Sequence, residues 1–416
     1  MARIAYVSPL PPAPTGIASY SAAVLPRLRR TGVGRIDAVW PVDGRAEEAV
    51  GRADLAVYHI GNNLDFHRDV YGLAVRHPGL VVLHDLSLDD LGGALLAVND
   101  PLGPPTRAEA LATAARLADG PAVDEPLRVP WCAFLARRSR GILVHSEFGR
   151  RYLEAFGCRT PAFVVPHPPV ETPAAIRRAA RRARRLRRRV APEGVLVGVL
   201  GDVGAAKGIE AVVEAVARVG PPARLAIVGR RIPMYDIEEV LARSGHRDLV
   251  TVAQDVSDAD FLAWLAACDV VVNLRHPHRG EVSGTLLRAF QAGVPAVVSA
   301  TGTYLDWPEG AVVRVPPGPP DADTLAPVLD GLVRDPARRA EIGRRGHALA
   351  DRLAAEDATA RGYRRAIDAT VALATDPARG ALARWADALA DVGATPETAA
   401  RGLGVDYADA LDELRS

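Results

Sequence analysis

The feature that most constrains the fold of this chain is a regular alternation of short apolar runs with helical stretches. In the first 170 residues, six runs rich in β-branched residues are predicted to be buried strands: 3–8, 36–40, 55–60, 80–84, 141–145 and 162–166. The predicted helices between them lie near 17–31, 65–76, 107–119, 126–139 and 147–156. Continuous apolar strands separated by helices are typical of a parallel sheet that is covered on both faces.

The same alternation returns in the second half of the chain. The strands expected there are 195–200, 223–228, 249–253, 269–274, 295–299 and 311–315. The pattern therefore predicts an α/β protein with two doubly wound domains, in which ligands bind beyond the carboxyl ends of the strands. Two such domains that face each other form a ligand cleft between them.

These patterns divide the chain into five parts. They are an N-terminal Rossmann-like domain (1–171), an arginine-rich linker helix (172–192), a C-terminal Rossmann-like domain (193–357), a helix expected to cross back to the N-terminal domain (358–375) and a helical appendage (376–416).

Charge and cysteine content narrow the class of protein. The 51 basic and 50 acidic residues leave a net charge of +1, which argues against a nucleic-acid or membrane-surface role for the whole chain. The N-terminal apolar stretch ends at Val7, too early for a signal peptide, and no apolar run approaches the ~18 residues of a membrane span. Cys132, Cys158 and Cys268 are too scattered for a disulfide framework or a zinc site. We expect a soluble, cytoplasmic protein.

The linker 172–192 carries nine arginines between Arg177 and Arg189, with apolar residues at three- and four-residue spacing. This spacing predicts an amphipathic helix. The arginines fit either a phosphate-rich or membrane-surface partner or a solvated helix at the domain junction. We favour the solvated helix, because arginine serves nearly every basic position of this chain and no aromatic residues are interleaved.

Lys207 is the only lysine among the 51 basic residues. It lies in the segment 199–208, VLGDVGAAKG, where a strand ends, a glycine-containing loop follows and a helix begins. A helix N-terminus favours an anion, and a lysine there suits a phosphate. The segment matches neither the dinucleotide-binding fingerprint nor the Walker loop, so its ligand is not identified by motif alone.

A second turn compatible with phosphate lies at 273–285, NLRHPHRGEVSGT. A carboxylate beside anion-binding groups makes sense if Glu281 accepts hydrogen bonds from sugar hydroxyls while Arg275 and the following helix amides hold a diphosphate. His276 and His278 lack the cysteine or carboxylate partners of a metal site, so we expect no metal.

The order of these elements resembles the family-4 (group 1) retaining glycosyltransferases of GT-B fold, over roughly residues 1–372. The resemblance rests on the Pro-rich loop with Thr15-Gly16, the His84-Asp85 pair at a strand end, the Lys207-Gly208 turn, and the segment from Glu281 to Ala292-Gly293-Val294-Pro295. It implies transfer of a sugar from a nucleotide-diphosphate sugar to a hydroxyl acceptor with retention of anomeric configuration. It also implies that no metal or other cofactor is needed, that the C-terminal domain binds the donor and that the N-terminal domain binds the acceptor.

Three sets of site residues follow from the resemblance and from the strand ends. The expected catalytic residues are His84, Lys207 and Glu281. The expected donor-binding residues are Gly16, Lys207, Gly229, Val256, Arg275, Glu281, Ser283, Gly284 and Thr285. The expected acceptor-binding residues are Asn62, Asn63, His67, Asp85 and His145.

The chain departs from the family pattern at two places. Asp202 stands where the family commonly has an arginine, and we expect Arg275 to supply the missing guanidinium. The motif of the family has a second glutamate, which binds ribose. Counting forward from Glu281 places Ala289 at this position, and counting back from Gly293 places Arg288 there. Ribose recognition in this chain must therefore differ.

Several other functions remain compatible with the sequence. A catalytically silent GT-B protein would bind a nucleotide without turnover, and a GT-B phosphorylase or sugar-nucleotide epimerase would react without a separate acceptor. A nucleic-acid binder built on Arg177–Arg189 would show salt-dependent binding. A dinucleotide oxidoreductase is the weakest alternative, because no GxGxxG follows a strand.

Overall fold

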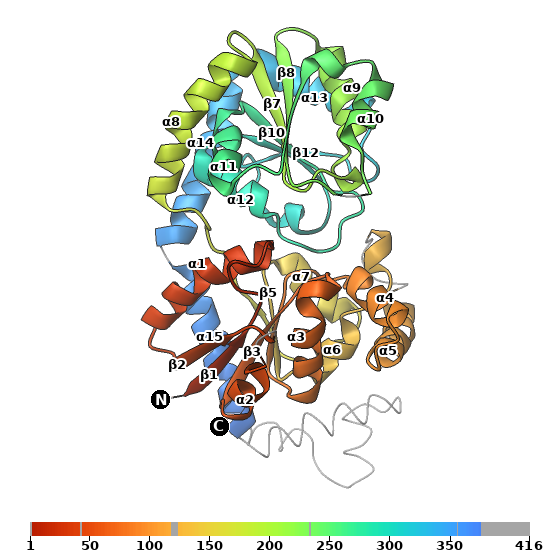
Figure 1. The fold of residues 1–416 in the computed structure, drawn as a ribbon, viewed down its shortest axis with the longest axis vertical. Coiled ribbons are helices and arrows are strands. Elements are labelled where there is room, and N and C mark those ends of the chain that lie inside the picture. The colour runs from red at the N-terminus through yellow and green to blue at the C-terminus, as the bar shows by residue number, and fades with distance from the viewer. Residues whose placement is uncertain (1, 42–43, 118–123, 233, 356, 376–416) are drawn as a thin grey trace.

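The computed structural model describes residues 2–41, 44–117, 124–232, 234–355 and 357–375. The chain forms two α/β domains stacked along the long axis of the molecule (Figure 1). Within the described residues, no helix has both the length and the apolar character needed to cross a membrane.

The N-terminal domain is built on a six-stranded parallel sheet with the order β2-β1-β3-β4-β5-β6. Its strands are β1 (Arg3–Val7), β2 (Arg35–Val39), β3 (Leu55–Ile60), β4 (Leu80–Leu83), β5 (Gly141–Val144) and β6 (Ala162–Val164). The strand order changes direction between β1 and β3, which is where a doubly wound sheet opens a crevice at its carboxyl edge.

The C-terminal domain repeats this plan with the order β12-β11-β10-β7-β8-β9. Its strands are β7 (Val195–Leu200), β8 (Ala223–Gly229), β9 (Val250–Gln254), β10 (Val270–Asn273), β11 (Ala296–Ser299) and β12 (Val313–Val315). Here the direction changes between β7 and β10, the two strands that precede the predicted phosphate-compatible turns. The predicted fold class, two facing doubly wound domains, is confirmed.

Helices cover both faces of the N-terminal sheet. They are α1 (Gly16–Arg30), α2 (Ala46–Gly51), α3 (Leu64–Arg76), α4 (Asp89–Ala97), α5 (Gly103–Leu117), α6 (Ala133–Arg138) and α7 (Glu147–Ala155). The prediction of one helix over 126–139 is wrong, because only a 3₁₀ turn (Glu125–Leu127) and the short α6 form there. Pro130 lacks an amide proton and pushes Val129 out of the helical region, which separates the two pieces. The short helices α2 and α4 were not predicted.

The C-terminal domain has an equivalent set of helices. They are α9 (Ile209–Val219), α10 (Ile237–Ser244), α11 (Asp258–Ala267), α12 (Gly284–Ala292), α13 (Ala322–Arg334) and α14 (Pro336–Ala355). The helix expected to open near Lys207 starts slightly later, at Ile209, after a 3₁₀ turn (Ala205–Lys207) and Gly208 with φ +60°. This positive φ favours glycine and lets the chain turn sharply into α9.

The arginine-rich linker forms α8 (Pro173–Val190), which packs against α11 on the outer side of the C-terminal domain (Figure 1). Ala179 and Ala183 are buried on its inner face, and Arg182 pairs with Asp260 at 3.2 Å. The predicted amphipathic helix is therefore present, and its apolar stripe lies against the domain.

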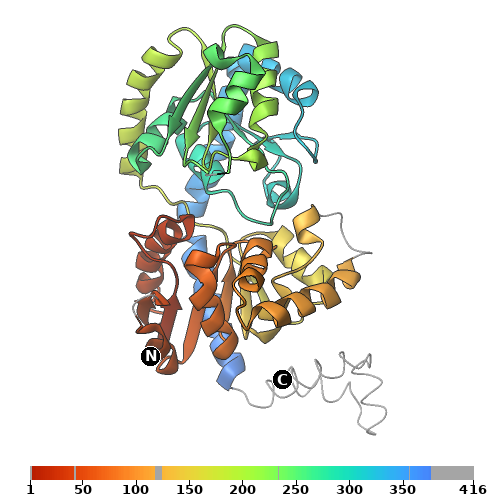
Figure 2. The same ribbon diagram turned by 45° about the vertical axis from the view of Figure 1, so that its right-hand side comes forward.

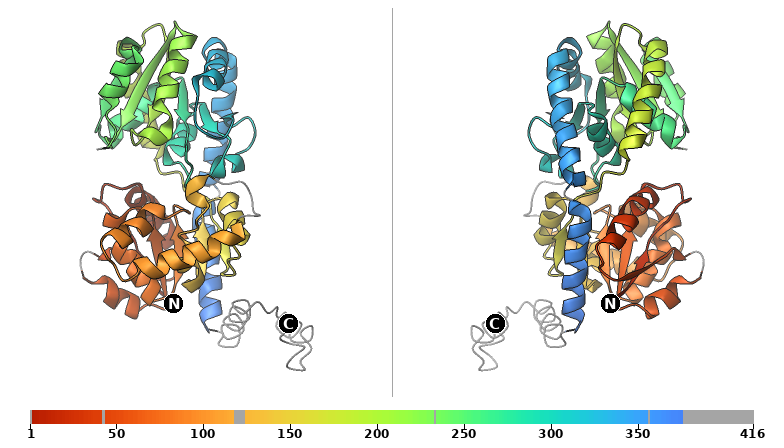
Figure 3. Two further views of the ribbon diagram at one scale, coloured as in Figure 1. Left: turned by 90° about the vertical axis from the view of Figure 1, so that its right-hand side faces the viewer. Right: turned by 90° about the vertical axis from the view of Figure 1, so that its left-hand side faces the viewer.

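The helix α15 (Ala358–Thr375) runs along the N-terminal domain and contacts α1 and the strands β3 to β6 (Figure 3). Tyr363 of α15 is fully buried, and its hydroxyl lies 2.8 Å from the hydroxyl of Tyr20 in α1. This helix, the last in the described part of the chain, thus completes the core of the first domain. The expected appendage 376–416 lies outside the described residues.

Candidate active site in the interdomain cleft

A cleft of about 720 Å³ lies where the carboxyl edges of the two sheets face each other. Figure 2 shows the two domains meeting along this line. The N-terminal wall consists of Thr15, Gly16, Ile17, Ser19, Tyr20, Gly61, Asn62, Asn63, His67, His84, Asp85, Asp90, His145, His167 and Val170. The C-terminal wall consists of Asp202, Gly204, Ala205, Ala206, Lys207, Arg230, Ile232, Arg275, Pro277, Arg279, Glu281, Val282, Gly284 and Arg288.

Lys207 lies at the floor of the C-terminal wall and is only 4% exposed. Its Nζ donates a hydrogen bond of 2.7 Å to the carbonyl oxygen of Leu200, at the end of β7. Gly201, with φ +107°, leaves room for the ammonium, since a Cβ there would lie 3.1 Å from Nζ. Burial lowers the pKa of Lys207 well below its ordinary value, and the nearby Arg275 lowers it further. A buried ammonium without a carboxylate bonded to it is a strong site for an anion.

Glu281 is held at the centre of the same wall by two donors. Arg275 Nε donates to Oε1 at 2.8 Å, and the backbone amide of Arg279 donates to Oε2 at 2.9 Å. Burial alone would raise the pKa of Glu281, but the charges of His278 and Arg275 outweigh burial and lower it. The carboxylate is therefore ionised and fixed in orientation. Arg275 lines the cleft, as the sequence predicted, and its guanidinium is held by Glu281.

Arg230 is a cleft residue that the sequence analysis missed. Its Nε and Nη2 donate to the two carboxylate oxygens of Asp202 at 3.0 and 2.8 Å, and its Nη1 donates to the carbonyl of Pro14 at 3.0 Å. The parallel register of β7 and β8 brings the residues beyond both strand ends side by side. The sequence signal that could have identified Arg230 is its position directly after the end of β8.

Four of the predicted donor-binding residues are not among those that line the cleft. They are Gly229, Val256, Ser283 and Thr285. Gly229 serves the backbone, because a Cβ at this position would lie 1.7 Å from the carbonyl oxygen of Gly201. The Ser283 hydroxyl caps α12 by accepting from the amide of Leu286 at 3.3 Å, and Val256 packs into the apolar cluster beside α11. Gly16 and Gly284 do line the cleft.

Asn62 and Asn63 line the cleft, but their side chains are engaged within the N-terminal domain. Asn62 Nδ2 donates to Asp89 at 2.8 Å, and its Oδ1 accepts from the amide of Leu91. Asn63 caps α3 by accepting from the amide of Asp65 at 2.9 Å. These bonds shape the loops of the N-terminal wall.

Asp85 faces the cleft from the end of β4. Its Oδ2 accepts from the backbone amide of Asn62 at 2.9 Å. Burial raises the pKa of Asp85 to about 7, and the charge of Glu281 from the opposite wall contributes in the same direction. Asp85 therefore holds a proton at a higher pH than an ordinary aspartate does.

Histidines gather at the carboxyl ends of β3 to β6. His67, His84, His145 and His167 line the cleft, and His59 lies buried beneath them with Nδ1 3.0 Å from Nε2 of His84. The ring centroids of His84 and His145 are 5.1 Å apart, and those of His145 and His167 are 5.5 Å apart. The sequence analysis missed His167 because it follows a short strand near the interdomain crossing and has no motif around it. Across the described ranges, no group of three or more His, Cys, Asp or Glu residues is arranged to hold a metal ion.

The two walls are bonded directly to each other. The carbonyl of Arg279 accepts from the amides of Leu86 and Ser87 at 3.0 and 3.2 Å, and its guanidinium pairs with Asp89 at 3.2 Å and Asp90 at 3.4 Å. The loop that carries Glu281 is thereby attached to the loop that carries Asp85. The geometry of the site thus depends on how the domains are closed.

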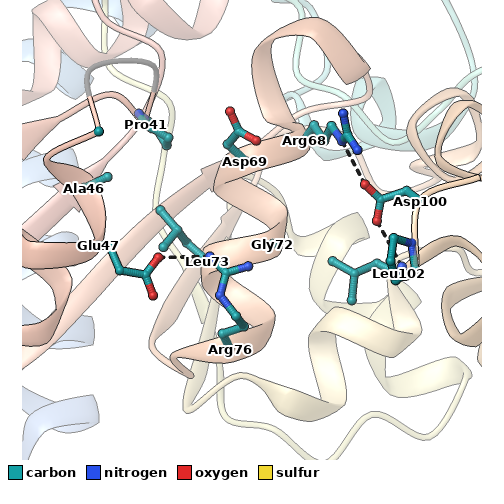
Figure 4. Close-up of a pocket in the computed structure, with 12 residues that line it drawn as sticks. Pro41, Ala46, Glu47, Arg68, Asp69, Gly72, Leu73, Arg76, Asp100 and Leu102 are labelled. Carbon is teal, nitrogen blue, oxygen red and sulfur yellow. Dashed lines mark hydrogen bonds and ion pairs between the residues drawn. The ribbon is translucent and has the colours of Figure 1, made fainter. Parts of the chain in front are cut away.

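A second hollow, of about 530 Å³, lies on the N-terminal domain away from the cleft (Figure 4). Four of its charged side chains are paired with one another, Arg68 with Asp100 at 2.8 Å and Arg76 with Glu47 at 3.0 Å. These pairs join neighbouring elements of the domain and leave little charge for a ligand. The interdomain cleft is therefore the candidate active site.

Comparison with known proteins identifies the family of the C-terminal domain. Residues 192–335 match the family model of the glycosyl transferases group 1. No curated protein matches the chain at a significant level. The match covers about a third of the chain, and it confirms the predicted resemblance to the group 1 glycosyltransferases and the prediction of a glycosyltransferase.

Solved structures match the fold over most of the chain. Alr3699/HepE of Anabaena, in complex with UDP-glucose, is 14% identical with a TM-score of 0.61, over 88% of this chain and 99% of that one. The sucrose-phosphate synthase of Thermosynechococcus elongatus is 18% identical with a TM-score of 0.62, over 89% and 100% of the two chains. The catalytic domain of starch synthase IV from Arabidopsis thaliana, bound to ADP and acarbose, is 12% identical with a TM-score of 0.54, over 89% and 99%. At these identities the likeness shows the shared GT-B fold.

Proposed function

We propose that this chain, which carries a group 1 glycosyltransferase domain within a GT-B fold, transfers a sugar from a nucleotide-diphosphate sugar to a hydroxyl acceptor with retention of configuration and without a metal ion. The observation that carries the proposal is that buried Lys207 and the fixed, ionised Glu281 line the same wall, at the switch point of the C-terminal sheet. A cation and a carboxylate side by side suit a ligand that has both phosphates and hydroxyls. The complexes of similar structures with UDP-glucose and ADP support a nucleotide donor.

The leaving diphosphate is stabilised by groups that are already in place. Lys207 and Arg230 lie on the C-terminal wall. Gly284 begins α12, and the first backbone amides of this helix form the positive end of its dipole. Such fixed donors cost no reorganisation as negative charge develops on the leaving group. They do for the diphosphate what a metal ion does in metal-dependent transferases.

The sugar is oriented by Glu281, which accepts hydrogen bonds from its hydroxyls. Arg275 and the amide of Arg279 hold the carboxylate in place, so it serves recognition and is not free to attack the anomeric carbon. Burial raises the pKa of Asp85 to about 7, and a carboxyl group that holds its proton more strongly is a poorer candidate for an ionised nucleophile. We therefore favour same-face transfer, in which the departing phosphate takes the proton of the acceptor hydroxyl.

The experiment that tests this function is donor turnover by the purified chain. A panel of nucleotides is first screened by thermal shift, and the corresponding nucleotide sugars are then offered with a panel of hydroxyl acceptors. We expect Lys207→Ala to lower transfer by on the order of 10²-fold with the fold intact. Arg231→Ala is the matched control, since Arg231 lies outside the cleft lining and pairs with Asp255.

Three outcomes would contradict the proposal. Nucleotide binding without turnover of any donor would show a catalytically silent protein. Reaction without a separate acceptor would show a phosphorylase or epimerase. Inversion of the anomeric configuration, read by proton NMR of the first product formed, would remove the retaining mechanism.

A further inference from the structure

The two walls of the cleft differ sharply in charge. Every lysine or arginine that lines the cleft in the described part of the chain comes from the C-terminal domain: Lys207, Arg230, Arg275, Arg279 and Arg288. The N-terminal wall contributes the carboxyl groups of Asp85 and Asp90 and no cation. The side of the cleft that faces away from the donor therefore offers no positive charge to an anion.

The arginines of the C-terminal wall are already matched by carboxylates. Arg230 pairs with Asp202 and Arg275 with Glu281, while the remaining two pair with acids of the N-terminal domain. Those two pairs are Arg279 with Asp89 and Arg288 with Glu171. Lys207, which is bonded to a backbone carbonyl, remains as the cation without a bonded carboxylate. The anion-binding capacity of the cleft is thus concentrated at the donor diphosphate.

Three histidines of the N-terminal wall have a fixed proton position. The Nδ1 atoms of His67, His145 and His167 lie 3.1, 2.8 and 2.9 Å from the backbone carbonyls of His59, Val165 and Pro168. Because a carbonyl can only accept, Nδ1 carries the proton in each ring and Nε2 carries the lone pair.

The same rings stay neutral at physiological pH. Burial lowers the pKa of His67 to about 4, that of His145 to about 4 and that of His167 to about 3. The Nε2 of His145 is buried and has no hydrogen-bond partner among the described residues, although the residue lines the cleft. A buried ring nitrogen without a partner costs free energy unless a ligand supplies a donor.

We propose that the acceptor is an uncharged polyhydroxyl molecule, whose hydroxyl groups donate to the Nε2 atoms of His67, His145 and His167. A hydroxyl satisfies a lone pair, whereas a phosphate or carboxylate oxygen would meet it with a second lone pair. An anionic acceptor would also lose its hydration beside Asp85, while the nearest guanidinium groups, those of Arg279 and Arg288, are already paired with carboxylates. The N-terminal wall therefore selects against acceptors that carry phosphate or carboxylate. This inference rests on the proposed glycosyl transfer.

The experiment compares matched acceptors on the wild-type enzyme at a saturating concentration of its donor. Each pair is an uncharged compound and its monophosphate ester, namely glucose with glucose 6-phosphate and myo-inositol with myo-inositol 1-phosphate. We expect binding of the uncharged member, and for any pair that reacts we expect kcat/KM for the phosphate ester to be at least about 100-fold lower. Binding is read independently by NMR of ¹⁵N-histidine-labelled enzyme, through the Nε2 resonance of His145.

Each result decides the inference. Perturbation of the His145 resonance by the uncharged members alone supports it, and perturbation by the phosphate esters, or by neither class, overturns it. Donor turnover with a phosphorylated acceptor would overturn the inference while leaving the proposed function intact. Absence of nucleotide binding in the thermal-shift screen would instead show that the proposed function has failed.

Variants of His145 separate recognition from folding. His145→Leu removes the lone pair and is expected to raise the KM of the uncharged acceptor about tenfold while the KM of the donor is unchanged. His145→Gln places an amide oxygen in the same region and is expected to restore part of the loss. Equal KM values for the acceptor in wild type and His145→Leu would overturn the role of this nitrogen.

Discussion

The guanidinium of Arg230 binds both carboxylate oxygens of Asp202, at 3.0 and 2.8 Å, on the donor side of the cleft. Asp202 occupies the position where the resembling family commonly has an arginine. A carboxylate at that position orients an arginine that comes from the end of the neighbouring strand. The structure therefore places a guanidinium, that of Arg230, beside this position, where it is held by Asp202. Arg275, which we expected to supply the guanidinium, lies on the same wall and is held by Glu281.

Replacement of Arg230 by alanine is expected to weaken donor binding about tenfold, since a charge-assisted hydrogen bond contributes about 1.5–3 kcal/mol. The dissociation constant of the donor, measured by calorimetry, tests this. Arg231→Ala is the matched control, because Arg231 is the next residue in the chain and pairs with Asp255 outside the cleft lining. Equal donor affinity in the two variants would exclude Arg230 from the donor site.

Lys207 is expected to make donor affinity dependent on pH. Burial lowers its pKa in the free protein, so the ammonium loses its proton as pH rises through this lowered value, and an anionic donor binds the protonated form. Affinity should therefore fall by up to about tenfold per pH unit above that pKa. Donor titrations from about pH 6 to about pH 9 measure the effect.

The matched variant for this test is Lys207→Arg, whose guanidinium stays protonated throughout the range. We expect a flat pH profile in this variant, even where its absolute affinity is lower. A wild-type profile as flat as that of the variant would show that Lys207 does not titrate in the free enzyme.

The pairing of Arg279 with Asp89 and Asp90 is expected to support catalysis by holding the two walls together. Removal of this interdomain pairing by Arg279→Ala should lower kcat about tenfold, equivalent to ~1.4 kcal/mol of activation free energy, with little change in donor affinity. Arg247→Ala is the control, because Arg247 pairs with Glu238 within one domain. If kcat equals that of the control, the backbone hydrogen bonds between the walls are sufficient to hold the domains in the active arrangement, and the ion pairs do not contribute.

The neutral histidines are expected to make the protein less stable in acid. Their pKa values are lower in the folded state than in the unfolded state, so the unfolded chain takes up protons first as pH falls below about 6.5. Each such histidine reduces the free energy of unfolding by about 1.4 kcal/mol per pH unit until its folded pKa is reached. Asp85 contributes with the opposite sign, because its pKa is about 7 in the folded state and 3.8 in the ordinary carboxyl group. Its contribution to stability therefore falls as pH rises from 3.8 to about 7.

The contribution of one histidine is isolated by comparison of wild type with His145→Gln. Urea unfolding measured from about pH 4.5 to about pH 7.5 should show a weaker loss of stability in acid for the variant, by about 1.4 kcal/mol per pH unit. Parallel pH profiles for the two proteins would contradict a neutral His145 in the folded state.

Much of the fold was predictable from local sequence. Each of the twelve predicted strands overlaps an observed strand, because a strand that is buried on both faces must be apolar throughout and the turns at its ends must be polar. The wrong prediction of a helix over 126–139 also had a local cause. The segment has helical periodicity, but Pro130 separates the helix α6 from the 3₁₀ turn before it. The sequence also predicted that Lys207 and Glu281 each follow the end of a strand, and the structure shows that these strands, β7 and β10, are neighbours.

By itself, the sequence determined two parallel sheets. It also determined that the functional side chains lie at the carboxyl edge of each sheet, because apolar periodicity and strand ends are properties of neighbouring residues. Only the tertiary structure decided which side chains pair there. Arg230 and Asp202 are separated by 28 residues, and Arg279 and Asp89 by 190. It also decided which nitrogen of each histidine carries the proton, since that depends on carbonyls brought close by packing. Pairings of this kind depend on side-chain direction and domain closure, which no local pattern encodes.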